Sequence, residues 1–235
     1  MGNLASGSAV TLWLIEAFIV AVPVVLAITL HEASHGLAAY RLGDPTAKEN
    51  GRLSLNPLRH VDLVGTVLLP GVLYTLGSLF FGTAVLFGWA KPVPVDPRRL
   101  RFLRSGLALV ALAGPGANLL MGLGWALVAK LSVVYYAQAP DTWNLLRDMS
   151  RYGIVVNTAL MVLNLLPLPP LDGGRVLVCV LPWRLARPVA RIEPFGIPIL
   201  IVLLFTPVLG WVILGPVQYV SDSLHNLAGI WGWRF

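Results

Sequence analysis

The chain has 235 residues, of which 57% are hydrophobic and only 12% are charged, and its mean hydropathy is +0.76. Soluble domains carry about 25% charged residues, so this composition excludes an ordinary soluble protein and indicates an integral membrane protein. The net charge of +6 does not indicate a nucleic-acid partner, because most basic residues lie in short loops between apolar runs, as in the positive-inside pattern of membrane proteins.

The first apolar run covers residues 9–42 and ends at Gly43-Asp44-Pro45, a glycine and proline combination typical of a helix end. Near its end stands His31-Glu32-Ala33-Ser34-His35. On a helix, histidines four residues apart leave the same face and can bind one zinc ion, while Glu32 can act as a base toward water. The run has no basic segment before it and continues directly into this motif, so it is not expected to be a cleavable signal peptide.

The second apolar run, residues 63–89, is interrupted by Pro70-Gly71 and by further glycines. These breaks favour a re-entrant hairpin, with a full crossing as the alternative. With a hairpin, loops that carry twelve Lys and Arg lie on one side of the membrane and loops that carry three lie on the other. The positive-inside rule then predicts an outside N-terminus and an active site toward the cytoplasmic side. In the preceding loop, Leu53 and Leu55 alternate with polar residues, which predicts a short strand.

Four further apolar runs follow, at residues 102–134, 152–166, 171–181 and 195–214. We therefore expect an all-α polytopic membrane protein with about four spanning helices, a re-entrant segment and a broken helix. A single domain over residues 1–235 is expected, with a core at 9–181 and a C-terminal helix and interfacial tail at 195–235. Trp231 and Trp233 are typical of such a tail.

A catalytic zinc site uses three protein ligands and keeps one open position. Cys179 is the only cysteine, which excludes a cysteine-based site. The two histidines supply two ligands, so the third is expected from elsewhere in the chain. Asp172 follows a proline break inside an apolar region and precedes Gly173-Gly174. A carboxylate in such a place is costly unless it binds a cation, so Asp172 is the candidate third ligand, with a helix N-cap as the alternative role.

Together, the His31-to-His35 motif and the segment Asn164-Leu165-Leu166-Pro167-Leu168-Pro169-Pro170-Leu171-Asp172-Gly173 resemble the two signature motifs of the site-2 proteases, which are intramembrane zinc metalloproteases. Gly114-Pro115-x-x-Asn118 and the stretch 87–95 resemble further segments of that family. The chain resembles its compact members and has no room for a PDZ or CBS domain. The resemblance implies one Zn²⁺ per chain, bound by His31, His35 and Asp172, with Glu32 as the general base.

The resemblance also implies that Asn164 lies near the substrate, although a polar bond between helices explains a buried asparagine equally well. The same two roles are open for Asn118, where the interhelical bond is favoured. Of the remaining histidines, His60 is expected to be structural and His225 to be solvated.

The expected function is hydrolysis of membrane-spanning protein substrates within or near the bilayer of the cell membrane. A non-proteolytic zinc-binding scaffold or chaperone is the alternative, but binding zinc alone would not require Glu32. A metal-ion transporter would need a polar path across the bilayer, which only 11 acidic residues, mostly in loops, do not provide.

Overall fold

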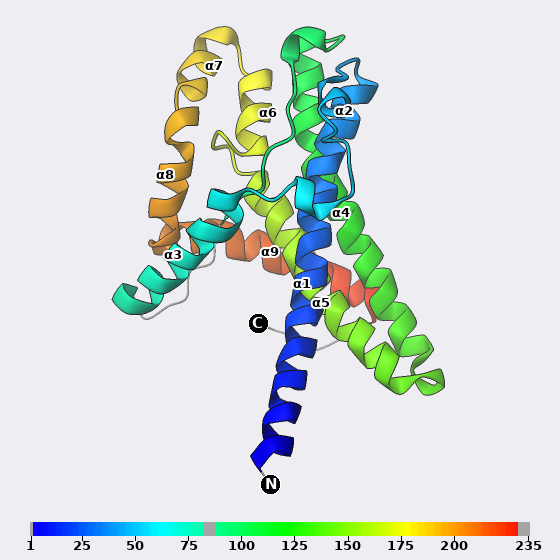
Figure 1. The fold of residues 1–235 in the computed structure, drawn as a ribbon. Coiled ribbons are helices and arrows are strands. Elements are labelled where there is room, and N and C mark those ends of the chain that lie inside the picture. The colour runs from blue at the N-terminus through cyan, green and yellow to red at the C-terminus, as the bar shows by residue number, and fades with distance from the viewer. Residues whose placement is uncertain (1, 82–87, 230–235) are drawn as a thin grey trace.

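The computed structural model describes residues 2–81 and 88–229, and this part of the chain is helical without any strand (Figure 1). Trp231 and Trp233 lie outside the described residues. The α-helices are α1 (Gly2–Arg41), α2 (Thr46–Glu49), α3 (Leu69–Leu76), α4 (Leu103–Val134), α5 (Pro140–Asn164), α6 (Asp172–Val180), α7 (Trp183–Ala190), α8 (Glu193–Leu204) and α9 (Pro207–Ala228). Short 3-10 or π turns cover Pro57–Arg59, Leu63–Leu68, Gly77–Phe81, Pro97–Arg99 and Tyr136–Gln138.

By length and composition, two of the described helices can cross a membrane, and a bent pair makes a third candidate. The two are Val10–Arg41 of α1 and all of α4, and the bent pair is α8 with α9. An all-α membrane protein is therefore the observed class, while the expected count of about four spanning helices stays a prediction. Helix α5, with 25 residues, is long enough to cross a membrane, but it is not one of the candidate spans. Its N-terminal half carries the charged residues Arg147, Asp148 and Arg151.

Two local predictions are wrong. The expected continuous run 195–214 is broken between α8 and α9, which meet at an angle of 89°. Thr206 is extended there, as residues before proline tend to be, and Pro207 begins α9 without an N–H to continue the ladder of α8. The expected strand at Leu53 and Leu55 is also absent, because Ser54 and Asn56 form local side-chain bonds to backbone amides instead of a ladder.

Helices α1, α4 and α5 pack closely and form the centre of the molecule. Small residues allow this approach, as is usual between membrane helices. A Cβ at Gly153 of α5 would lie 2.4 Å from the indole of Trp125 on α4. Next to this contact between α4 and α5, Ala126, Ala129 and Ile154 form a buried cluster with two residues of α9.

The two ends of the 63–89 segment lie side by side. The Trp89 amide donates to the carbonyl of Gly65 over 3.1 Å, and the Lys91 amide donates to the carbonyl of His60 over 2.8 Å. The Thr66 hydroxyl also donates to the Trp89 carbonyl. The 63–89 segment thus begins and ends at the same place in the molecule.

Most loops rich in Lys and Arg gather at one end of the molecule, where α2, the start of α4 and α7 lie (Figure 1). The N-terminus and the turn between α4 and α5 lie at the opposite end.

Asp44 holds the basic end together just after α1. Its carboxylate is fully buried and accepts hydrogen bonds from the Thr46 amide and hydroxyl and from the Asp96 amide. Burial opposes the charged form, but these hydrogen bonds outweigh it, so the pKa of Asp44 lies below its ordinary value of 3.8.

Candidate metal centre

Two histidines of α1 and an aspartate of α6, far away in sequence, converge between these two helices. The Nε2 atoms of His31 and His35 lie 3.1 Å apart, and Oδ2 of Asp172 lies 3.3 Å from the first and 3.4 Å from the second. They form the single group of three possible metal ligands found in the described residues. With metal–ligand bonds of 2.0–2.1 Å, the ligands of a tetrahedral zinc ion stand about 3.3 Å from one another. The spacing of the three atoms therefore fits zinc.

In the neutral imidazoles, the hydrogen bonds of both rings place the ring hydrogen on Nδ1 and leave the lone pair of Nε2 free. Nδ1 of His35 lies 2.7 Å from the carbonyl of Val110, which can only accept, so Nδ1 carries the hydrogen. Nδ1 of His31 lies 2.5 Å from Oδ1 of Asn118, which also accepts. Oδ2 of Asp172 is buried and has no hydrogen-bond donor in the described structure. Three electron-rich atoms thus face one point, an arrangement that a cation satisfies.

Gly114 of α4 leaves the room for this arrangement. A Cβ at this position would lie 2.4 Å from Nε2 of His35 and 2.5 Å from Cε1 of His31. Pro115, the next residue, has no N–H to donate to the Ala111 carbonyl four residues earlier, and the adjacent Val110 carbonyl accepts from His35. The sequence Gly-Pro therefore shapes the wall of α4 that faces both histidines.

A tightly packed proline loop places Asp172 in the first turn of α6. The bond between Pro169 and Pro170 is cis, and Leu171, not Asp172, is the residue before the helix. A Cβ at Gly174 would lie 2.2 Å from the Pro169 nitrogen, and one at Gly196 of α8 would lie 1.8 Å from the Pro169 oxygen. Glycines on two helices thus hold this loop, and Asp172 points to the histidines instead of capping α6.

Glu32 lies on α1 between the two histidines and is partly buried. Its Oε2 accepts a hydrogen bond of 3.2 Å from the amide of Val93, in the irregular segment that precedes α4. Arg52 anchors that segment, because its guanidinium donates to the carbonyl of Lys91 over 2.8 Å and also to the carbonyl of Arg59. The position of the Glu32 carboxylate therefore depends on a loop about sixty residues away in sequence.

The structure separates the two asparagines named from the sequence. Asn118 is fully buried and makes the expected interhelical bonds, to His31 and to Asn157, so no part of it is open to a substrate in this conformation. Asn164 is partly buried at the end of α5, and its one hydrogen bond in the described structure goes to the carbonyl of Leu160 in its own helix. The sequence reading missed Asn157, although it lies two helical turns before Asn164 in an apolar run.

His60 and His225 lie outside this group. Both are buried, at 2% and 4% exposure. The prediction that His225 is solvated is wrong, because α9 is packed against α4 and α5 and not a free tail.

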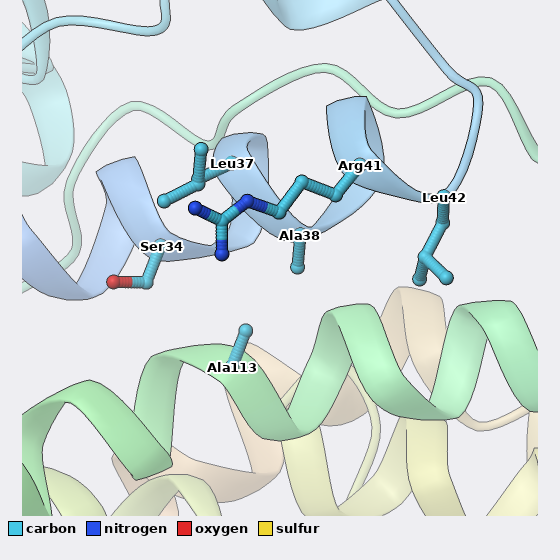
Figure 2. Close-up of a pocket in the computed structure, with 6 residues that line it drawn as sticks. All are labelled: Ser34, Leu37, Ala38, Arg41, Leu42 and Ala113. Atoms are coloured by element: carbon cyan, nitrogen blue, oxygen red, sulfur yellow. The ribbon is translucent and has the colours of Figure 1, made fainter.

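An open groove follows the seam between α1 and α4 next to the centre (Figure 2). Its volume is about 290 Å³, and its lining consists of Ser34, Leu37, Ala38, Arg41, Leu42 and Ala113. The Arg41 side chain runs back along α1 toward Ser34. Ser34 and Ala113 directly precede His35 and Gly114 in the sequence, but none of the three ligand residues lines the groove.

Residues 128–207 match peptidase family M50. A relative described as "putative zinc metalloprotease YwhC" of Bacillus subtilis (strain 168) is 34% identical over 88% of this chain and 89% of its own length. "Putative zinc metalloprotease Rip2" of Mycolicibacterium smegmatis is 31% identical over 78% of this chain and 65% of its own length, and the protein of that name from Mycobacterium tuberculosis (strain H37Rv) is 29% identical over 86% and 74%.

No solved structure matches the chain. The similarity to YwhC covers nearly the whole of both chains, including the segments that carry His31, His35 and Asp172. The chain therefore belongs to peptidase family M50, the family of the site-2 proteases that its motifs resemble.

Proposed function

We propose that this protein is an intramembrane zinc metalloendopeptidase that hydrolyses peptide bonds of membrane-spanning proteins. The observation that carries the proposal is the meeting of three possible ligand atoms from His31, His35 and Asp172, with Glu32 between the two histidines on α1. Membership of family M50 and the names of the relatives agree with it. In this proposal His31, His35 and Asp172 hold one Zn²⁺ and Glu32 is the catalytic residue.

A bound zinc ion would polarise the scissile carbonyl and lower the pKa of a water ligand to about 7. Glu32 accepts the proton of the attacking water and later donates it to the leaving amine. The Val93 amide holds one carboxylate oxygen of Glu32, which leaves the other free for proton transfer. Asn164, partly buried at the end of α5 and with its carbonyl oxygen uncommitted in the described structure, is the residue proposed to contact the substrate.

The substrate class follows from the depth of the site. His31 lies ten residues before the end of the apolar helix α1, or about 15 Å along its axis at 1.5 Å per residue. A peptide bond cleaved there belongs to a segment within or near the bilayer, and that segment has to be extended locally because a helix shields its own peptide bonds.

The proposal places the basic end of the molecule in the cytoplasm and the N-terminus outside. The charge distribution of the loops supports this orientation. The hydrogen bonds between the ends of the 63–89 segment support a re-entrant hairpin instead of a crossing, since entry and exit share one place. A four-span topology then also requires α5 with α6, and α8, to cross.

Two variants test the function. Zinc per protein, measured after purification in detergent with zinc supplied, is expected to be close to one in the wild type and in Glu32→Gln and to fall sharply in Asp172→Ala. Co-expression with a panel of tagged single-span proteins is expected to give cleaved products with the wild type only.

Zinc content and cleavage, measured together, distinguish a protease from a zinc-binding scaffold. If wild type and Glu32→Gln bind zinc equally and give the same products, Glu32 is not the catalytic residue and a zinc-binding scaffold becomes the better description. If the wild type takes up no zinc, the site is not the proposed metal centre.

A further inference from the structure

A buried row of side-chain amides links the centre to α5. Nδ1 of His31 meets Oδ1 of Asn118 at 2.5 Å, Nδ2 of Asn118 donates to Oδ1 of Asn157 over 3.0 Å, and Nδ2 of Asn157 donates to the Gly153 carbonyl over 2.8 Å. The exposures are 7% for His31 and 0% for both asparagines. Water therefore does not compete for these bonds, and each depends on its neighbours.

Each side-chain amide in this row has one possible orientation, and the backbone carbonyl of Gly153 sets it. The carbonyl of Gly153 can only accept, so the NH₂ group of Asn157 has to face it and its Oδ1 has to face Asn118. Asn118 then turns its own NH₂ toward Asn157, and over a longer distance of 3.5 Å also toward the Ala27 carbonyl, and presents Oδ1 to His31. A reversed Asn118 would place two carbonyl oxygens, its own Oδ1 and that of Asn157, against each other and would offer His31 a donor in place of an acceptor.

We propose, on the basis of the metal centre assigned above, that Asn157 is a positioning residue for that centre. Acting through Asn118, it fixes the orientation of the His31 ring and places the ring hydrogen on Nδ1. The lone pair of Nε2 then faces His35 and Asp172, as a metal ligand requires. Asn157 itself touches neither the ligand atoms nor the reacting groups.

His35 provides an internal comparison for this assignment. Its Nδ1 donates to the backbone carbonyl of Val110, which cannot be reversed by rotation of a side chain. The state of His35 is therefore independent of the asparagines, whereas that of His31 rests on two amide groups that can each turn by half a rotation. Loss of Asn157 is expected to affect one of the two histidines only.

Asn157→Leu tests the proposal, because it removes both polar ends at similar volume. The matched control is Thr158→Val, which removes a neighbouring buried hydroxyl on α5 that has no hydrogen-bond partner in the described structure. Zinc affinity, measured by competition with a chelator, is expected to fall by about 10- to 100-fold in Asn157→Leu, the usual effect of losing an outer partner of a ligand. Thr158→Val is expected to match the wild type.

The second readout is the ¹⁵N spectrum of histidine-labelled, zinc-free protein at alkaline pH, where neutral rings report which nitrogen carries the hydrogen. Four histidines make the spectrum assignable by single substitutions. We expect the Nδ1–H form for His31 and His35 in the wild type, and a mixture for His31 alone in Asn157→Leu.

Unchanged zinc affinity or an unchanged His31 signal in Asn157→Leu overturns the proposal, even if the variant is less stable. Should that variant not fold, the wild-type spectrum still decides, since an Nε2–H form of His31 contradicts the row of hydrogen bonds. Because this spectrum needs neither metal nor cleavage, its result does not depend on the outcome of the protease assay.

Discussion

Gly114→Ala should abolish tight metal binding without unfolding α4. The added Cβ would lie 2.4 Å from Nε2 of His35, whereas ordinary contact begins at 3.4 Å, so the rings or the helix have to move apart. The resulting shift of about 1 Å is several times the tolerance of about 0.2 Å in metal–ligand distances. The rings cannot turn away cheaply, because Asn118 and the Val110 carbonyl hold their Nδ1 atoms.

From this displacement we expect zinc affinity to fall by about 100-fold or more, the size of effect that a 1 Å misplacement can have on a catalytic rate. Overpacking should also lower the free energy of unfolding by about 1–3 kcal/mol. Intrinsic helix propensity alone predicts the opposite sign, since alanine is better than glycine in a helix by about 1 kcal/mol.

The assay is zinc content and chelator competition on detergent-purified protein, with Gly116→Ala as the control. Gly116 lies two residues along the same helix and has no atom within 4 Å of a built Cβ, so its variant should bind zinc as the wild type does. Wild-type affinity in Gly114→Ala would refute the reasoning, because the methyl group would then have found room that the structure denies it.

Three further outcomes are expected. Gly174→Ala should lower zinc content, because its Cβ would lie 2.2 Å from the Pro169 nitrogen and would displace the loop that sets Asp172; atomic absorption measures this. Arg52→Ala should increase hydrogen exchange of residues 88–95, since the segment loses its anchor at the Lys91 carbonyl, and should lower the rate of cleavage more than zinc content. Asp44→Asn should be less stable than the wild type at neutral pH; because the pKa of Asp44 is lowered in the folded protein, the difference should persist above pH 3.8 and shrink as the pH falls below it, as followed by thermal midpoints in detergent.

Matched substitutions give each of these a control. Gly215→Ala meets no atom within 4 Å, Arg98→Ala removes an exposed arginine with no ion pair in the described structure, and Asp141→Asn changes an exposed carboxylate. Zinc loss in Gly215→Ala would contradict the argument for Gly174. Faster hydrogen exchange of residues 88–95 in Arg98→Ala would contradict the argument for Arg52. The argument for Asp44 would fail if Asp141→Asn showed a pH-dependent loss of stability as large as that of Asp44→Asn.

The sequence was most informative where chemistry depends on local spacing. The four-residue interval of His31 and His35 and the proline break before Asp172 suffice to name the three residues that the structure brings together. The family was also predicted correctly from these motifs. Local spacing fixes which side chains leave one face of a helix, and the high cost of polar groups among apolar residues identifies the exceptions.

The missed features depend on contacts between distant segments. Nothing local shows that Val93 donates to Glu32 or that Asn157 supports Asn118, because these bonds join different segments of the chain. The break at Thr206 was missed for another reason: a proline is compatible with a continuous membrane helix when its neighbours compensate, so Pro207 alone does not decide between a kink and a corner.

The proline loop before α6 does not tolerate insertions or deletions between Pro167 and Asp172. Its backbone is packed against Gly174 and Gly196, and Gly173 is packed against Leu165 and Leu166 just before it, so the loop has no slack to absorb an extra residue. A one-residue insertion between Pro167 and Asp172 would therefore have to shift the start of α6 and move the Asp172 carboxylate away from both histidines. Homologous sequences that bind metal in the same way are expected to align in this stretch without gaps.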